Sequence, residues 1–167
     1  THPLWTGSTP SHPAVRKEME QSADVVLVVG SELAETDYDF FFLGDVAMQG
    51  KVIRVDIDAA QLLRNHRADV AVYAEASLAL DAIAEQVDAV SPENGFQRVT
   101  ELKEALADLN KPQYQAFFNV IDEVLGDCVI VGDSTQPAYY AQAYYETKAP
   151  GRYFHSTTGY GTLGYAF

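Results

Sequence analysis

The sequence lacks features that define several large classes of proteins. It has one cysteine, Cys128, so no internal disulfide can form. Only 11 of the 167 residues are Lys or Arg, whereas 24 are Asp or Glu, and the formal net charge is −13. Nucleic acids and anionic membrane surfaces are bound by clustered basic side chains. We therefore expect neither of these partners.

The sequence also lacks membrane and targeting signals. No apolar run is long enough to cross a bilayer. Residues 1–5, THPLW, show neither the basic nor the apolar part of a secretory signal peptide. Together with the single cysteine, these features predict a cytoplasmic protein. The chain has no initiator Met and stops at Phe167, directly after a glycine-rich loop. We expect it to be an internal fragment of a longer protein.

The first half of the chain has the pattern of an α/β fold. Residues 24–29 and 51–58 are rich in β-branched side chains and predict buried strands. Residues 69–73 predict a third strand, and a helix with Ser77 as its N-cap follows over 78–87. This order predicts a parallel sheet in a Rossmann-like domain, of which residues 1–90 form the C-terminal part.

One alternative function depends on the first strand. Gly30 ends that strand, and Asp56 lies about where a ribose-binding acid follows in dinucleotide-binding folds. The fingerprint of those folds needs three glycines, and only Gly30 is present here. A strand-end acid is therefore the simpler interpretation of Asp56. A non-catalytic nucleotide-binding module stays open as an alternative.

The second half predicts another α/β domain. A turn cluster begins at Ser91, and residues 91–110 are expected to form a linker and a helix. A helix over 112–125 is predicted to have Phe117, Val120, Ile121 and Val124 on its core face. Cys128 to Val131 is expected to be a buried strand, within a domain that covers residues 111–167.

Polar and glycine residues follow this last strand. Gly132-Asp133-Ser134-Thr135 stands at its carboxyl end, which is where ligands bind in open α/β sheets. Glycines at 159, 161 and 164 allow a backbone to approach a ligand closely. Arg152 and His155 lie near this loop and are weaker candidates for substrate contacts, since a lone Arg or His is more often structural.

Two separated regions carry a resemblance to a known family. Residues 23–30 and 51–58 are similar to the later part of the central domain of thiamine-diphosphate-dependent enzymes, in the acetolactate synthase and 2-oxo acid decarboxylase group. Residues 131–136 and the motif GYGTLGYA at 159–166 are similar to the opening of the family's diphosphate-binding domain. Residues 35–39 and 133–137 look most like 5-guanidino-2-oxopentanoate decarboxylases.

The resemblance implies a function and a set of site residues. The intact protein would bind thiamine diphosphate and Mg²⁺, and would decarboxylate a small 2-oxo acid through a cofactor ylid and enamine, as a homodimer or homotetramer. The Gly161 carbonyl and the Leu163 N–H would meet the cofactor's pyrimidine, and the Leu163 side chain would support its bent shape. The other implied cofactor-binding residues are Ser134, Thr135, Gln136 and Thr162.

The resemblance also implies what this chain does not supply. The family's Gly-Asp-Gly…Asn metal motif should follow Phe167, and Gly132-Asp133-Ser134 is not that motif. The catalytic Glu belongs to an N-terminal domain, usually of a partner subunit. We therefore expect no catalytic residue and no metal ligand here, and an inactive isolated chain. The alternative activity is acetolactate synthesis by acyl transfer, in which the central domain of the intact protein holds a non-redox FAD.

Overall fold

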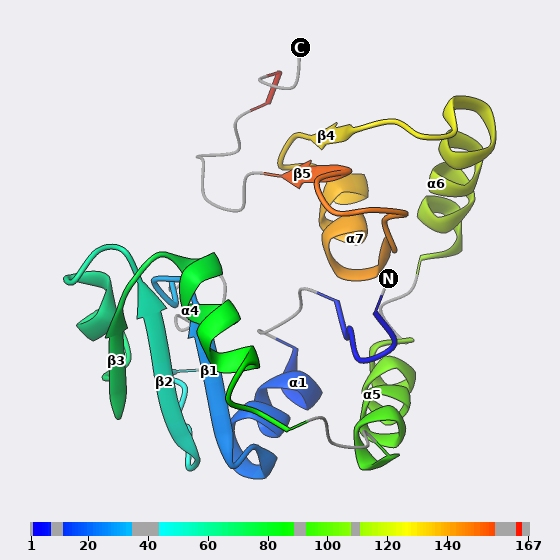
Figure 1. Ribbon diagram of the computed structural model, residues 1–167. Coiled ribbons are helices and arrows are strands. Elements are labelled where there is room, and N and C mark those ends of the chain that lie inside the picture. The colour runs from blue at the N-terminus through cyan, green and yellow to red at the C-terminus, as the bar shows by residue number, and fades with distance from the viewer. Residues whose placement is uncertain are drawn as a thin grey trace. The chain divides into compact units, whose positions relative to one another are not determined.

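The computed structural model describes residues 2–7, 12–34, 44–88, 93–107, 111–155 and 163–164. The chain divides into two compact units (Figure 1). One consists of Pro10–Pro92, and the other of Thr1–Thr9 together with Glu93–Phe167. The domain limits expected from the sequence, 1–90 and 111–167, stay a prediction, because compactness alone does not define a domain.

The unit Pro10–Pro92 is built on a parallel sheet. Its strands β1 (Val25–Val29), β2 (Lys51–Asp56) and β3 (Val70–Tyr73) lie in the order β1-β2-β3, and both neighbouring pairs are parallel. The β-branched runs therefore form the predicted strands, and the expected α/β class is confirmed. Parallel strands end at the same edge, so the segments after β1 and β2 lie next to each other.

Short helices accompany this sheet. They are α1 (Pro13–Lys17), the π-turn η1 (Glu18–Ser22), the 3-10 turn η2 (Gln61–Leu63) and α4 (Ala76–Ala84). Glu75 caps α4 by accepting from the Leu78 N–H at 3.1 Å, and the Ser77 hydroxyl donates to Glu75. The expectation that Ser77 is the N-cap is wrong, because the longer Glu75 side chain reaches the first free N–H groups.

One core cluster of this unit lies on a single face of the sheet. Val28, Leu33 and Val52 are buried there, and Val26 and Met48 pack against them. Leu33 follows β1 and reaches this position with a φ of 54°, which is unusual for a residue with a side chain. The segment after β1 therefore covers the same face as the buried strand residues.

The second unit contains three helices and a two-stranded sheet. The helices are α5 (Glu93–Leu106), α6 (Pro112–Leu125) and α7 (Gln136–Tyr144). Strands β4 (Ile130–Gly132) and β5 (Tyr153–His155) are parallel, and Gly132 is in register with His155. The expected strand over 128–131 begins two residues later, so Cys128 lies before β4 rather than inside it.

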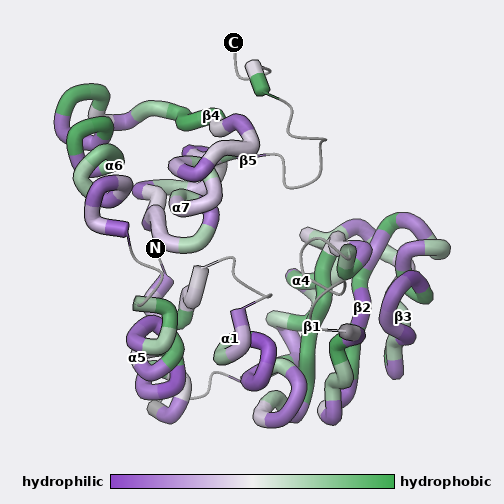
Figure 2. Tube along the Cα trace, turned by 180° about the vertical axis from the view of Figure 1, so that it is seen from behind, coloured by the Kyte–Doolittle hydropathy of each residue, from purple (hydrophilic) through white to green (hydrophobic). Residues whose placement is uncertain are grey.

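An aromatic cluster holds α6 and α7 together. Phe118, Tyr140 and Ala141 are buried, with Tyr114, Ile121 and Ile130 packed against them. The predicted core face of α6 is wrong except for Ile121. Phe117, Val120 and Val124 are 51%, 56% and 72% exposed. Hydrophobic and hydrophilic residues alternate along α6 (Figure 2), and Tyr140 of α7 packs on Phe118.

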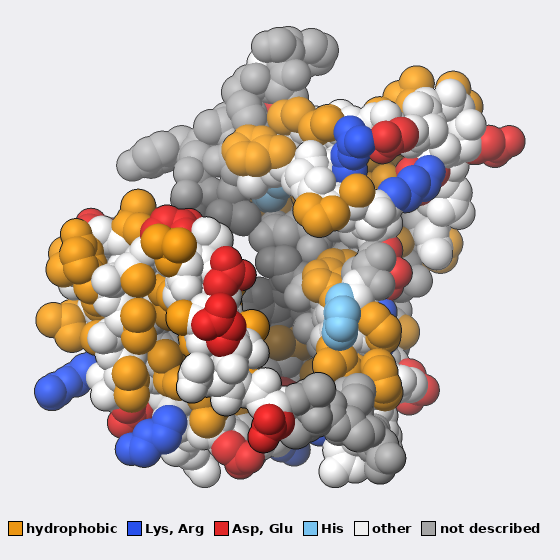
Figure 3. Space-filling model, in the orientation of Figure 1, with side chains coloured by type: hydrophobic (Ala, Val, Ile, Leu, Met, Phe, Trp, Pro, Cys, Tyr) orange, Lys and Arg blue, Asp and Glu red, His pale blue; other side chains and the backbone are white. Residues whose placement is uncertain are grey.

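Exposed apolar side chains occur in both units (Figure 3). In the second unit, Val131 and Phe154 are paired in the β4–β5 sheet and are exposed, whereas Ile130 and Tyr153 point toward the aromatic cluster. Among the helices of the described residues, none has the length and apolar composition needed to cross a membrane.

Candidate cofactor site

The carboxyl end of β4 leads directly into α7. Gly132 is the last residue of the strand, and a Cβ at this position would lie 2.9 Å from the Ala138 Cβ. Any larger residue would push α7 away from the strand, so glycine permits the close approach. Asp133, Ser134 and Thr135 then span the short connection to Gln136, where α7 begins. The predicted site residues 134, 135 and 136 are therefore brought to one helix start.

The N-terminus of α7 presents backbone donors. Thr135 is the N-cap, and its side chain makes no capping hydrogen bond to the helix. Its hydroxyl instead donates to the Asp133 carbonyl, at 3.5 Å. The first N–H groups of a helix and its dipole both favour a negatively charged ligand. In the first turn of α7, Gln136 and Ala138 carry N–H groups, whereas Pro137 has none.

A lysine from another element stands beside this helix start. Lys111 Nζ donates to Gln136 Oε1 at 3.2 Å, and it also lies 5.8 Å from the centre of the Tyr114 ring. Lys111 precedes α6 and is 25 residues away from Gln136. The sequence pattern gave no signal for it, because the contact depends on how α6 packs on α7. The lysine adds a positive charge beside the start of α7.

Asp133 joins the two segments expected at the cofactor. Its Oδ2 accepts a hydrogen bond from the Gly164 N–H at 2.6 Å. Gly164 has a φ of 90°, which explains a glycine at this turn. Leu163 is 73% exposed, so its side chain is available to a ligand. Gly161 and Thr162, the other predicted residues, lie outside the described residues.

Asp133 is not among the cofactor-binding residues predicted from the sequence, although it belongs to the strand-end segment Gly132-Asp133-Ser134-Thr135. The sequence feature that could have indicated Asp133 is its position between a strand and the start of a helix. A carboxylate at such a position can accept a hydrogen bond from a backbone N–H of another turn. Asp133 also stands where a metal ligand could be suspected. Within the described residues, however, no three His, Cys, Asp or Glu side chains gather as a metal site would require.

The two weaker candidates, Arg152 and His155, lie at either end of β5. Arg152 pairs with Asp127 at 2.7 Å, an exposed contact before β4. His155 lies opposite Gly132, with Tyr139 edge-on at 5.5 Å and Tyr153 at 6.4 Å between ring centres. Both His155 ring nitrogens are buried, and none of the described residues bonds to them. Burial of the ring lowers the pKa of His155 from its ordinary value, because it disfavours the charged form.

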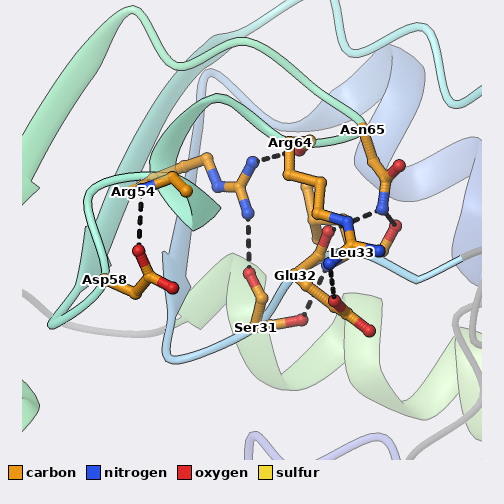
Figure 4. A network of polar contacts seen from close by, with 8 residues as sticks. Ser31, Glu32, Leu33, Arg54, Asp58, Arg64 and Asn65 are labelled. Carbon is orange, nitrogen blue, oxygen red and sulfur yellow. Dashed lines mark hydrogen bonds and ion pairs between the residues drawn. The ribbon is translucent and has the colours of Figure 1, made fainter.

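The carboxyl edge of the first sheet is occupied by the protein itself (Figure 4). Arg54 on β2 is 1% exposed and donates to the carbonyls of Ser31, Arg64 and His66. The Asn65 amide donates to the Glu32 and Leu33 carbonyls at 2.9 and 3.0 Å. These bonds tie the segment after β1 to the segment that follows η2.

The two residues that suggested a nucleotide are parts of ordinary turns. Gly30 has a φ of 61° and donates its N–H to the Val55 carbonyl. Asp56 Oδ1 accepts from the Asp58 N–H at 2.8 Å, which caps the turn after β2. This geometry agrees with the simpler interpretation of a strand-end acid.

Comparison with known proteins places the chain among thiamine enzymes. Residues 1–83 match the family described as thiamine pyrophosphate enzyme, central domain. This range contains β1, β2 and β3. A probable 2-ketoarginine decarboxylase of Pseudomonas aeruginosa is 31% identical over 154 residues, which cover 89% of this chain.

Two further relatives are probable acetolactate synthase large subunits. That of Methanocaldococcus jannaschii is 28% identical over 185 residues, and that of Methanococcus aeolicus is 28% identical over 193 residues. Each alignment covers 99% of this chain. The chain spans only 27%, 30% and 31% of the length of these three relatives. It belongs to the thiamine pyrophosphate enzyme family, and its residues 1–83 belong to that family's central domain.

Proposed function

We propose that residues 111–167 open the diphosphate-binding domain of a thiamine-diphosphate-dependent enzyme that decarboxylates a 2-oxo acid. The observation that carries the proposal is the bond from the Gly164 N–H to Asp133 Oδ2. This bond holds Gly164 beside the segment that leads into α7. Two stretches that the family resemblance assigns to one cofactor are thereby in contact, although they are 31 residues apart.

The residues present fit the proposed cofactor. A diphosphate needs backbone donors and positive charge, and the uncapped start of α7 with Lys111 supplies both. The turn at Leu163 and Gly164 leaves an exposed apolar side chain beside these donors. When bound, thiamine diphosphate supplies a nucleophilic carbon and an electron sink for the carbanion that remains after CO₂ leaves.

Each residue of the site then has a defined task. Ser134, Thr135 and Gln136 hold the diphosphate, and Lys111 offsets part of its charge. Asp133 keeps Gly164 in place, which fixes the backbone around Leu163. The Gly161 carbonyl and the Leu163 N–H orient the pyrimidine, the Leu163 side chain supports the bent cofactor, and Thr162 contributes a hydroxyl. Mg²⁺ ligands and the catalytic acid would come from sequence or subunits beyond these residues.

The choice of substrate is the finer part of the proposal. The relative that is 31% identical is named a 2-ketoarginine decarboxylase. We therefore place simple decarboxylation of a 2-oxo acid first, in a cytoplasmic homo-oligomer of the intact protein. The alternative is acyl transfer to a second 2-oxo acid, since two relatives are named acetolactate synthase large subunits. A bound, non-redox FAD in the intact protein would favour this alternative.

Activity of the protein in its natural full length tests the proposal. A panel of 2-oxo acids would be supplied with thiamine diphosphate and Mg²⁺, and CO₂ release would be followed. We expect turnover that stops when either addition is omitted, with an aldehyde as the product. Acetolactate as the product would favour the alternative activity. Nucleotide binding without any thiamine-dependent turnover would instead support the non-catalytic module.

A further inference from the structure

A pocket lies at the C-terminal end of α7, away from Thr135 and the candidate cofactor site. It has a volume of about 290 Å³ and is lined by residues of α6, the end of α7 and the segment that follows it. All of these residues belong to the second unit. The site proposed for the cofactor uses the first residues of α7, whereas this pocket uses Tyr140, Tyr144 and Tyr145.

Aromatic rings make up much of the pocket wall. Phe118 and Tyr140 are stacked, with centres 6.1 Å apart and planes only 16° from parallel. Tyr145 tilts toward Phe118 at 5.0 Å, and Tyr144 tilts toward Tyr140 at 5.1 Å. The face of an aromatic ring attracts a cation, and attracts a flat guanidinium especially well because it can also stack.

The polar groups of the pocket are carboxylates, phenols and the side-chain amides of Gln115 and Asn119. Asp122 and Glu146 contribute carboxylates to the lining. Tyr145 donates its hydroxyl hydrogen to Asp122 Oδ1 at 2.7 Å, and Tyr144 donates to the Leu106 carbonyl at 3.1 Å. These two phenols have thus committed their hydrogens, and their oxygens can still accept. A ligand that brings donors matches this pocket better than one that brings acceptors.

Lysines already stand beside both carboxylates. Lys148 Nζ lies 3.4 Å from Asp122 Oδ1, and Lys103 Nζ lies 2.9 Å from Glu146 Oε1. Each of these contacts uses one oxygen of the carboxylate, so the second oxygen can accept from a ligand. A cationic ligand would therefore have to compete with Lys148 and Lys103 for these carboxylates, in a protein whose net charge of −13 attracts cations overall.

We propose that this pocket binds the guanidinium group of a small molecule, stacked on the rings of Phe118, Tyr140 and Tyr145 and hydrogen-bonded to Asp122 and Glu146. Planarity and the fork of N–H donors distinguish guanidinium from an ammonium ion. The volume of about 290 Å³ is enough for one guanidinoalkyl chain. The proposal does not depend on the cofactor, so either proposal can fail without the other.

The test is a titration of the protein with methylguanidinium chloride, with total ionic strength held constant by NaCl. Amide NMR shifts of α6 and α7 would report binding at the pocket. We expect a saturable change with a Kd on the order of 1 mM, which corresponds to about 4 kcal/mol of binding free energy. N-methylurea has the same shape without the charge, and methylammonium has the charge without the plane. Both should bind at least fivefold more weakly.

Variants separate the pocket from general surface charge. Asp122→Asn should weaken methylguanidinium binding at least fivefold, and Glu146→Gln about threefold. Lys148→Met should tighten it, because a competing cation is removed. Asp127→Asn is the matched control, since it removes the same charge from an exposed carboxylate outside the pocket. A thermal transition within a few degrees of the wild type would show that each variant is folded.

Several results would overturn the proposal. These are the absence of saturable binding by the wild type, equal binding of N-methylurea, or equal weakening by Asp122→Asn and Asp127→Asn. If Asp122→Asn does not fold, Glu146→Gln and Lys148→Met decide the question, because they must change the Kd in opposite directions.

Discussion

The two units have carboxyl edges of the same kind and use them differently. In the unit Pro10–Pro92, the segments after β1 and η2 are bonded to each other through Arg54 and Asn65. In the second unit, the segment after β4 leads into a helix start with no side-chain cap. At the first edge, backbone carbonyls accept hydrogen bonds from Arg54 and Asn65. At the second edge, the N–H groups at the start of α7 have no side-chain cap and suit an anion. A strand-end location therefore does not identify a ligand site unless its backbone groups are available.

The largest effect should come from removing the side chain of Arg54, which holds the segments after β1 and η2 together. Arg54→Leu removes the donor of three backbone carbonyls in a buried position. We expect the free energy of unfolding to fall by roughly 3–5 kcal/mol. Urea denaturation followed by circular dichroism would measure it.

Arg64→Leu provides the matched control for this change. Arg64 makes an exposed ion pair with Glu32 at 2.9 Å, and such pairs contribute about 1 kcal/mol or less. Equal losses for the two arginine variants would contradict the view that Arg54 closes this edge.

The second unit can be tested at α6. Phe118→Ala removes a buried ring from the aromatic cluster and should cost about 3–4 kcal/mol. Phe117→Ala changes the neighbouring ring, which is half exposed, and should cost less than about 1 kcal/mol. Thermal unfolding of both variants would compare them. A larger loss of stability for Phe117→Ala than for Phe118→Ala would mean that the face predicted from the sequence, with Phe117, is the buried one.

The smallest effect concerns pH. His155 has a lowered pKa in the folded state, so the unfolded chain, with a value near 6.5, takes up the proton first as pH falls. Its neutral form therefore contributes stability above pH 6.5, and that contribution is lost as pH falls through the folded pKa. Tyr139 and Tyr153 contact the ring.

His155→Phe keeps a ring between these tyrosines and removes the titration. Between pH 8 and pH 5, the variant should lose less stability than the wild type in parallel denaturation series. Identical pH dependence in the two proteins would show that His155 is not the group responsible.

Much of the fold could be predicted because β-branched runs define strands by composition alone. The segments that form β1, β2 and β3 are of this kind. The alternation of strand and helix patterns along the chain indicated that these strands would be parallel. The core face of α6 could not be predicted in the same way. Residues 117, 120 and 124 repeat with helical spacing as well as 114, 118 and 121 do. Only the position of α7 decides which stripe is buried.

In the candidate site, too, some residues could be predicted from local sequence and others could not. The strand-end position of Ser134 and Thr135 was predicted from local order, whereas Gln136 and the cofactor-binding role of all three residues were implied by the family resemblance. Asp133 and Lys111 act through contacts with residues 31 and 25 positions away. No local pattern contains such pairs. The hydrogen bonds that Arg54 makes at the edge of the first sheet could not be predicted either, since they depend on the buried position of this side chain.

The most direct test of the central claim is calorimetric titration of the full-length protein with thiamine diphosphate in the presence of Mg²⁺. Wild type would be compared with Asp133→Ala, and Asp127→Ala would serve as the exposed control. If the bond from Gly164 to Asp133 forms the cofactor site, Asp133→Ala should raise the Kd about tenfold, equivalent to about 1.4 kcal/mol, while Asp127→Ala leaves it unchanged. Unaltered binding by a folded Asp133→Ala protein would contradict the account.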